Sequence, residues 1–97
     1  MHEKAALEKA EQDLRGMLKA TGLLAKGSYQ PQEVQDILGI SESEFHRMIN
    51  RYERRSDGVL RNPCSLDSFV LNRHRRVRFG ELVDFLRRNN SAARICG

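Results

Sequence analysis

The sequence predicts a mainly α fold with a small β-hairpin. Apolar residues recur every three or four positions near the start, in the middle and near the end of the chain, which is the period of an amphipathic helix. Only residues 69–79 suggest paired strands: residues 69–71 form a short apolar run, and residues 76–79 alternate polar and apolar side chains. The chain has 97 residues, of which 39% are hydrophobic, so it can build one modest core.

The first segment, residues 2–25, is predicted to be an amphipathic helix. Its apolar stripe consists of Leu7, Ala10, Leu14, Met17, Thr21 and Leu24. We expect Gly27 to end this region in a left-handed conformation. Two uses of the stripe are open: it packs against the rest of the chain, or it pairs with a second copy to form a homodimer. We therefore divide the chain into an N-terminal helix (1–27), a central domain (28–90) and a flexible tail (91–97).

Local signals next predict two short helices, residues 31–38 and 42–52, joined by a tight turn. The signals are Pro31 at the first helical position, Gly39 as a left-handed stop, Ile40 as a buried plug, and Ser41 with Glu44 as an S-x-x-E capping box. The second helix is expected to face the core with Phe45, Met48, Ile49 and Tyr52.

The opposite face of the second helix is polar and basic. It comprises Ser43, His46, Arg47, Asn50, Arg51 and Arg54. Arginine suits guanine and asparagine suits adenine in the DNA major groove, so we predict that Arg47 and Asn50 read bases, supported by Ser43, His46 and Arg51. We expect Glu42 to pair with His46, four residues on, and Glu44 to be occupied by its own cap.

After a connection over residues 55–66, the pattern predicts a strand (69–71), a turn (72–75) and a return strand (76–79). Val77 and Phe79 are expected to face the core, with Arg76 and Arg78 on the opposite side. The cationic or titratable residues of this hairpin are Arg73, His74, Arg75, Arg76 and Arg78. Because arginine binds phosphate bidentately, we predict that they grip a nucleic-acid backbone without sequence preference.

A last helix is predicted from Glu81 to about Asn89. Leu82, Val83, Phe85 and Leu86 are expected to close the core, and Arg87 and Arg88 to offset the negative end of the helix dipole. The net charge of the chain is +4. Residues 59–97 contain eight basic and three acidic side chains, so the positive charge is concentrated in this last third and favours an anionic partner.

These motifs together resemble a known family. The run PQEVQDILGISESEFHRMINR, followed by RRVRFGELVDFL, resembles the compact winged helix-turn-helix of the MerR and excisionase-like DNA-binding families, over about residues 29–88. The resemblance implies a winged helix-turn-helix, here preceded by the N-terminal amphipathic helix. It also implies a bacterial or phage protein that binds double-stranded DNA, either as a transcription regulator or as an architectural factor, with a recombinase or the transcription machinery as partner.

Other classes of protein are not favoured by the sequence. His2, His46 and His74 lie in three separate predicted elements, and we find no Gly-rich phosphate loop, so we expect no enzyme, cofactor or metal. Cys64 and Cys96 are expected to be free thiols. The absence of a long apolar run predicts no membrane contact and a cytoplasmic, nucleoid-associated protein. The alternative function is a winged-helix module that binds another protein and not DNA.

Overall fold

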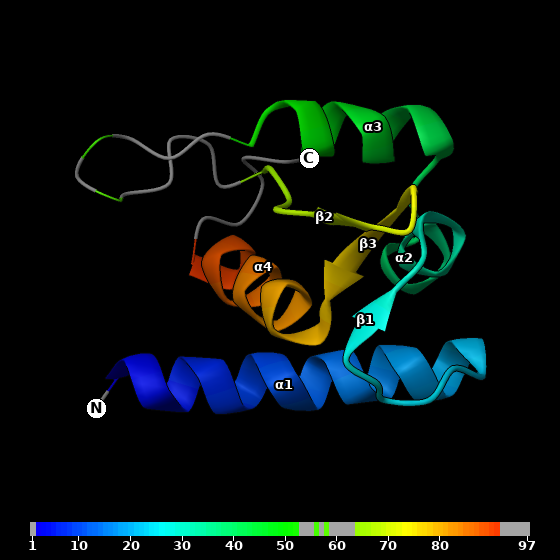
Figure 1. Ribbon diagram of the computed structural model, residues 1–97. Coiled ribbons are helices and arrows are strands. Elements are labelled where there is room, and N and C mark those ends of the chain that lie inside the picture. The colour runs from blue at the N-terminus through cyan, green and yellow to red at the C-terminus, as the bar shows by residue number, and fades with distance from the viewer. Residues whose placement is uncertain (1, 53–55, 57, 59–63, 92–97) are drawn as a thin grey trace.

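The computed structural model describes residues 2–52, 56, 58 and 64–91. In this part of the chain, four helices lie around a small antiparallel sheet (Figure 1). The helices are α1 (His2–Thr21), α2 (Pro31–Leu38), α3 (Glu42–Asn50) and α4 (Phe79–Ser91), and the strands are β1 (Ser28–Tyr29), β2 (Phe69–Leu71) and β3 (His74–Arg78). The prediction of a mainly α fold with a small β-hairpin is therefore confirmed.

Helix α1 ends at Thr21, four residues before the predicted end. Gly22 adopts a left-handed conformation with φ 77°. Its N–H donates to the Lys19 carbonyl at 3.2 Å, and the N–H of Leu23 donates to the Leu18 carbonyl at 2.9 Å. These two bonds form a Schellman motif, which satisfies the last carbonyls of the helix. The prediction that Gly27 ends this region in a left-handed conformation is wrong, because the earlier glycine already does so.

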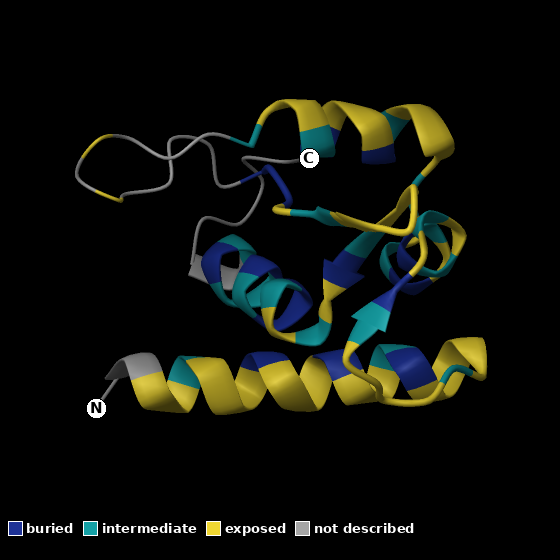
Figure 2. Cartoon of the chain, in the orientation of Figure 1, coloured by how far each residue is buried: buried dark blue, intermediate teal, exposed yellow. Residues whose placement is uncertain are grey.

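The buried side of α1 packs along α4, beneath the sheet in the view of Figure 1. Its buried residues are Ala10, Leu14 and Leu18, and they belong to one core cluster with residues of every other helix (Figure 2). The predicted stripe is wrong at its ends, because Leu7 is 38% and Leu24 is 81% exposed. It also omitted Leu18, which is 2% exposed. The sequence left two roles open for this helix, and the structure shows the first of them: α1 packs against the rest of its own chain.

The two central helices begin at the predicted residues. Gly39 is left-handed with φ 67°, and Ser41 Oγ accepts a hydrogen bond from the Glu44 N–H at 3.1 Å. Phe45 and Met48 are buried on the inner face of α3, whereas Ile40 is only half-buried. Helix α3 ends at Asn50, two residues before the predicted end.

Strand β3 lies at the centre of the sheet, in the order β1-β3-β2. Strand β1 was not predicted; it pairs Ser28 with Arg78 and Tyr29 with Val77. On the other side, Leu71 pairs with His74, which leaves a turn of only Asn72 and Arg73. The predicted turn over residues 72–75 is therefore wrong, and His74 and Arg75 belong to β3. Phe79, predicted as the last strand residue, begins α4 and is half-buried.

Arg88 of α4 is a buried cation, with only 8% of its surface exposed. Its guanidinium forms an ion pair with Glu81 at 2.9 Å, a second with Asp84, and a hydrogen bond to the Ser65 carbonyl. Glu81 also accepts from the Asp67 N–H at 3.0 Å. Arg88 lies in the last turn of α4, where its charge was predicted to offset the helix dipole; its burial and its two ion pairs were not predicted. Arg88 joins α4 to the segment that leads into the hairpin. Arg88 and Ser65 are far apart in the sequence, so local patterns do not indicate this contact.

We expect this cluster to make stability depend on pH. Partial burial raises the pKa of Asp84, but a hydrogen bond from Arg87 and the charges of Arg88 and Arg87 outweigh it, so the pKa of Asp84 is below its ordinary value. A carboxyl with a lowered folded-state pKa stabilises the fold above about pH 4 and loses that contribution as the pH falls further. Asp84→Asn should therefore be less stable than the parent at pH 7, and urea unfolding should show the difference shrinking towards pH 2. A difference in the free energy of unfolding that stays constant from pH 7 to pH 2 would contradict the lowered pKa of Asp84.

Cys64 is buried and disulfide-bonded, so the prediction of a free thiol at this position is wrong. A long separation between two cysteines in the sequence is no argument against a disulfide, because the entropy cost of closing a loop rises only slowly with its length. The other cysteine of the sequence, Cys96, lies outside the described residues.

Several predictions concern residues that the structure does not describe. They are the outward position of Arg54, most of the connection over 55–66, and the tail beyond Ser91. Among the helices of the described part, none combines the length and apolar character needed to span a bilayer.

Candidate nucleic-acid interface

The outer face of α3 is open to solvent along its whole length (Figure 2). Ser43, His46, Arg47, Asn50 and Arg51 are all exposed, as the helical period predicts. The helix is held from below by Phe45 and Met48, which are 0% and 4% exposed. The N–H of Leu66 also donates to the Met48 carbonyl at 3.0 Å, near the end of α3. A rigid helix therefore presents these five side chains from one surface.

Two basic side chains of this face already contact acids on the same helix. Nη2 of Arg47 lies 2.5 Å from Oε2 of Glu44, and Nε2 of His46 lies 3.6 Å from Oε1 of Glu42. The expected pairing of Glu42 with His46 is confirmed. The expectation for Glu44 is only half right, because Ser41 caps the helix while the Glu44 carboxylate binds Arg47. These pairs are exposed, so they are weak and can exchange for another anion.

The hairpin ends in a two-residue turn with an unusual backbone. Asn72 and Arg73 both have positive φ angles, of 51° and 68°. Such turns fit the twist of a hairpin and usually carry asparagine followed by glycine. Arginine in the left-handed region costs roughly 1 kcal/mol more than glycine. The chain thus places a cation at its hairpin tip in a conformation that glycine would adopt more readily, and strain of this kind is typical of functional sites.

The basic side chains at this end of the hairpin have no acidic partner among the described residues. Arg73 and His74 are exposed and form no ion pair there. Arg75 is exposed too, and its Nη1 donates to Ser68 Oγ at 2.5 Å. A neutral hydroxyl leaves the charge of Arg75 in place. The tip is therefore a compact positive surface.

The other two arginines of the hairpin that were predicted to bind phosphates lie on the outer face of the sheet. Arg76 is half-buried, and its Nε donates to Ser28 Oγ at 2.7 Å, so its guanidinium is tied to β1. The guanidinium of Arg78 stacks over the Phe69 ring, 4.3 Å from the centroid. Val77 faces the core on the opposite side, as predicted. Arg78 remains exposed to solvent. Arg76 is oriented by its hydrogen bond to Ser28 of β1, the strand that was not predicted from the sequence.

A groove of about 370 Å³ separates the hairpin tip from the start of α2. It is lined by Gln30, Pro31, Leu71, Asn72, Arg73, His74, Arg75 and Arg76. The acid beside this helix start is Glu33, which accepts from Lys26 Nζ at 2.7 Å and from the Gln30 N–H at 2.9 Å. Partial burial raises the pKa of Glu33, but these two hydrogen bonds and the charges of Lys26 and Arg76 bring it below its ordinary value. Glu33 is therefore compensated locally, and the groove is mainly cationic.

Sequence reasoning missed the residues that orient this groove. Ser28 lies in a two-residue strand, which is too short to show any alternation, and Ser68 lies in an irregular segment. The tyrosine of β1 followed by Gln30 and Pro31 was the available signal, because aromatic residues favour strands and the residue before proline is extended.

The chain matches no protein-family model, no curated protein and no solved structure.

Proposed function

We propose that the protein binds double-stranded DNA, with α3 in the major groove and the hairpin on the phosphate backbone. The observation that carries the proposal is the positive hairpin tip, formed by Arg73 and Arg75 on either side of His74, which has no acidic partner among the described residues. Clustered cations repel one another, and an anionic polymer relieves that repulsion with release of its counterions.

Helix α3 has the dimensions and the side chains that base reading requires. Its nine residues extend about 13.5 Å at 1.5 Å per residue. A helix is about 10–12 Å across with its side chains, so it fits a major groove about 12 Å wide. Arg47 can present its planar fork to guanine, and Asn50 can bond adenine through its amide. Ser43, His46 and Arg51 flank them on the same face.

The hairpin supplies contacts that do not depend on sequence. Arg73, His74, Arg75 and Arg78 are exposed and reach phosphates from the tip and outer face, while Arg76 adds charge from its place beside Ser28. This division gives α3 the specificity and the hairpin most of the salt-dependent affinity. Regulation of transcription and architectural bending of DNA both begin from such binding.

A second candidate is a module that binds an acidic protein. Val70 and Leu71 of β2 are 59% and 54% exposed and lie beside the cationic tip, which favours a partner with apolar as well as acidic groups. Such an interface would depend on salt far less than a DNA complex.

The proposal is tested first at Arg47. After selection of a preferred duplex from a random library, Arg47→Ala should weaken binding to that duplex by about 1–3 kcal/mol and to random duplexes much less. The reason is that Arg47 exchanges Glu44 for a base edge only on the preferred site. Fluorescence anisotropy measures both affinities, and Lys9→Ala, an exposed charge on α1, is the control. Equal losses on both duplexes would make Arg47 a phosphate contact, and no DNA binding by the parent would refute the proposal.

A further inference from the structure

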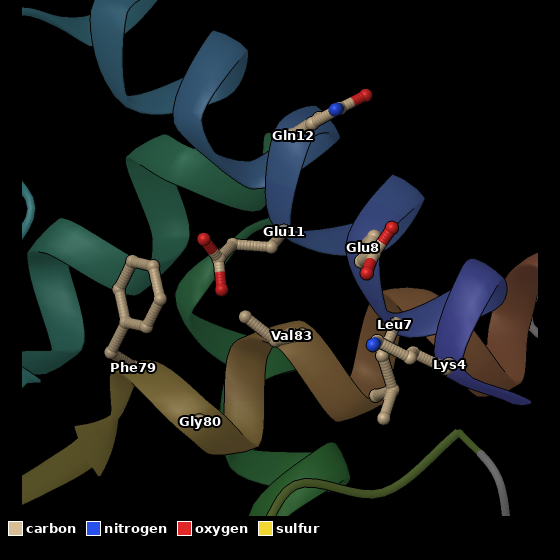
Figure 3. A pocket seen from close by; sticks show the side chains of 8 residues that line it. All are labelled: Lys4, Leu7, Glu8, Glu11, Gln12, Phe79, Gly80 and Val83. Atoms are coloured by element: carbon tan, nitrogen blue, oxygen red, sulfur yellow. The ribbon is translucent and has the colours of Figure 1, made fainter.

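Helix α1 carries a groove with acidic edges along its first half. The groove, of about 590 Å³, lies between α1 and the start of α4 (Figure 3). Leu7, Phe79 and Val83 form its apolar floor, and Glu8 and Glu11 lie at its edge, with Lys4 at the end. In Figure 3 the Glu11 carboxylate points from α1 towards Phe79 and Val83. The groove is open to solvent, so an apolar side chain of a partner could pack on its floor.

A second groove with basic edges lies along the other half of the same helix. It has a volume of about 280 Å³, an apolar lining that includes Leu18, Leu23 and Leu24, and Arg15 and Lys19 at its edge. Leu24 is the most exposed of the large apolar residues in the described part of the chain, at 81%. This end of α1 therefore presents an apolar side chain among cations.

The charges of the two grooves lie on one flank of the helix. Glu8, Glu11, Arg15 and Lys19 are three, four and four residues apart, which places them in one row. Within the chain, Arg15 Nε lies 3.2 Å from Glu11 Oε2, and both side chains are about half exposed. Arg15 also lies over the Phe79 ring at 5.4 Å. An exposed pair of this kind is weak, so both groups remain available to a partner.

We propose that this flank of α1 is a self-association surface on which a second copy of the chain docks antiparallel. A two-fold interface must be complementary to itself, so that the acidic half of one copy faces the basic half of the other. With the axis between Gln12 and Arg15, Glu11 faces Arg15 of the second copy and Glu8 faces its Lys19. Lys4 then faces Gly22, which has no side chain. At each end of the interface, the apolar floor of the acidic groove in one copy then meets the apolar lining of the basic groove in the other.

The charge pattern favours a second copy over other occupants, because one chain supplies both halves of the complement. The surface shares Leu7 and Leu24 with the stripe that the sequence predicted, but not Leu14, which is fully buried in the core. The exposed apolar area is small, so the dimer is weak and salt-sensitive. The proposal does not rest on DNA binding.

Two charge reversals provide the test. Glu8→Lys with Glu11→Lys makes the row entirely basic, and Arg15→Glu with Lys19→Glu makes its charges acidic after Lys4. Sedimentation velocity at low ionic strength should show the parent associating, and each variant alone associating about tenfold less or weaker still. An equimolar mixture of the two variants should recover the association, because each complements the other. Circular dichroism checks that both variants keep their helix content.

The results that would overturn the proposal are equally definite. They are a parent that stays monomeric at about 100 μM, variants that associate as the parent does, or a mixture that does not associate. Leu24→Asp is a further variant at a position beyond the helix that is 81% exposed, so we expect the chain to fold as before. It should weaken parent association as well, and unchanged association would place the interface elsewhere.

Discussion

Leu14→Ala is expected to lower the free energy of unfolding by about 2–5 kcal/mol. Leu14 is 0% exposed in the middle of α1, and it belongs to the cluster that includes Tyr29, Phe45 and Leu82. Truncation removes apolar burial and leaves a cavity between helices that cannot fully collapse. A chain of this size has about 5–15 kcal/mol of total stability, so the loss is a large share of it. Urea unfolding followed by circular dichroism measures it.

Leu24→Ala is the matched control, because it makes the same chemical change at a residue that is 81% exposed. At concentrations low enough to keep the chain monomeric, it should change stability by no more than about 0.5 kcal/mol. A similar loss in both variants would contradict the packing of α1. The same reasoning predicts that a chain starting at Gly27 does not fold, since Ala10, Leu14 and Leu18 would all be missing from the core.

Arg88→Ala is expected to cost about 3–5 kcal/mol of stability. The substitution leaves the carboxylate of Glu81, only 12% exposed, without the cation that neutralises it. It also removes a donor to the carbonyl of Ser65, a buried residue of the segment that leads into β2. A buried charge or acceptor without its partner costs far more than an exposed one. Thermal unfolding should show the loss, and the hairpin should be the element that is most disturbed.

Arg87→Ala is the control for Arg88. Arg87 binds the same Asp84, through Nη2 at 2.7 Å, but its side chain is 28% exposed. Water can replace much of what it provides, so the expected cost is about 1 kcal/mol or less. If the two substitutions cost the same, burial of the Arg88 cluster would not be the source of its contribution.

The elements predicted best from the sequence are those with several local signals that agree. Helices α2 and α3 begin where Pro31 and Ser41 indicated, and the left-handed Gly39 separates them. Each of these signals acts through neighbours in sequence, by capping or by backbone conformation, so tertiary packing had little to override. The exposed face of α3 followed directly from the helical period.

The features that the sequence did not reveal are long-range. Arg76 is bound by Ser28, forty-eight positions away, and Arg88 by Ser65, twenty-three positions away. Strand β1 has only two residues, which are too few to show the alternation of a strand, and it is defined by its pairing with β3. Two glycines followed the first helix, and only the packing of Leu18 and Leu23 decides that Gly22 ends it. Sequence reasoning therefore found the basic residues of the candidate interface and the pairing of His46 with Glu42, but not the contacts that hold Arg47 and Arg76.

The most direct test of DNA binding is the dependence of affinity on salt for a random-sequence duplex. With about five phosphates neutralised by the hairpin and α3, the logarithm of the association constant should fall with the logarithm of salt concentration at a slope of about −4 to −5. Arg73→Ala with Arg75→Ala should flatten the slope by about two, because these exposed cations have no acidic partner among the described residues. A parent slope near zero, or a double variant with the parent's slope and affinity, would contradict the account.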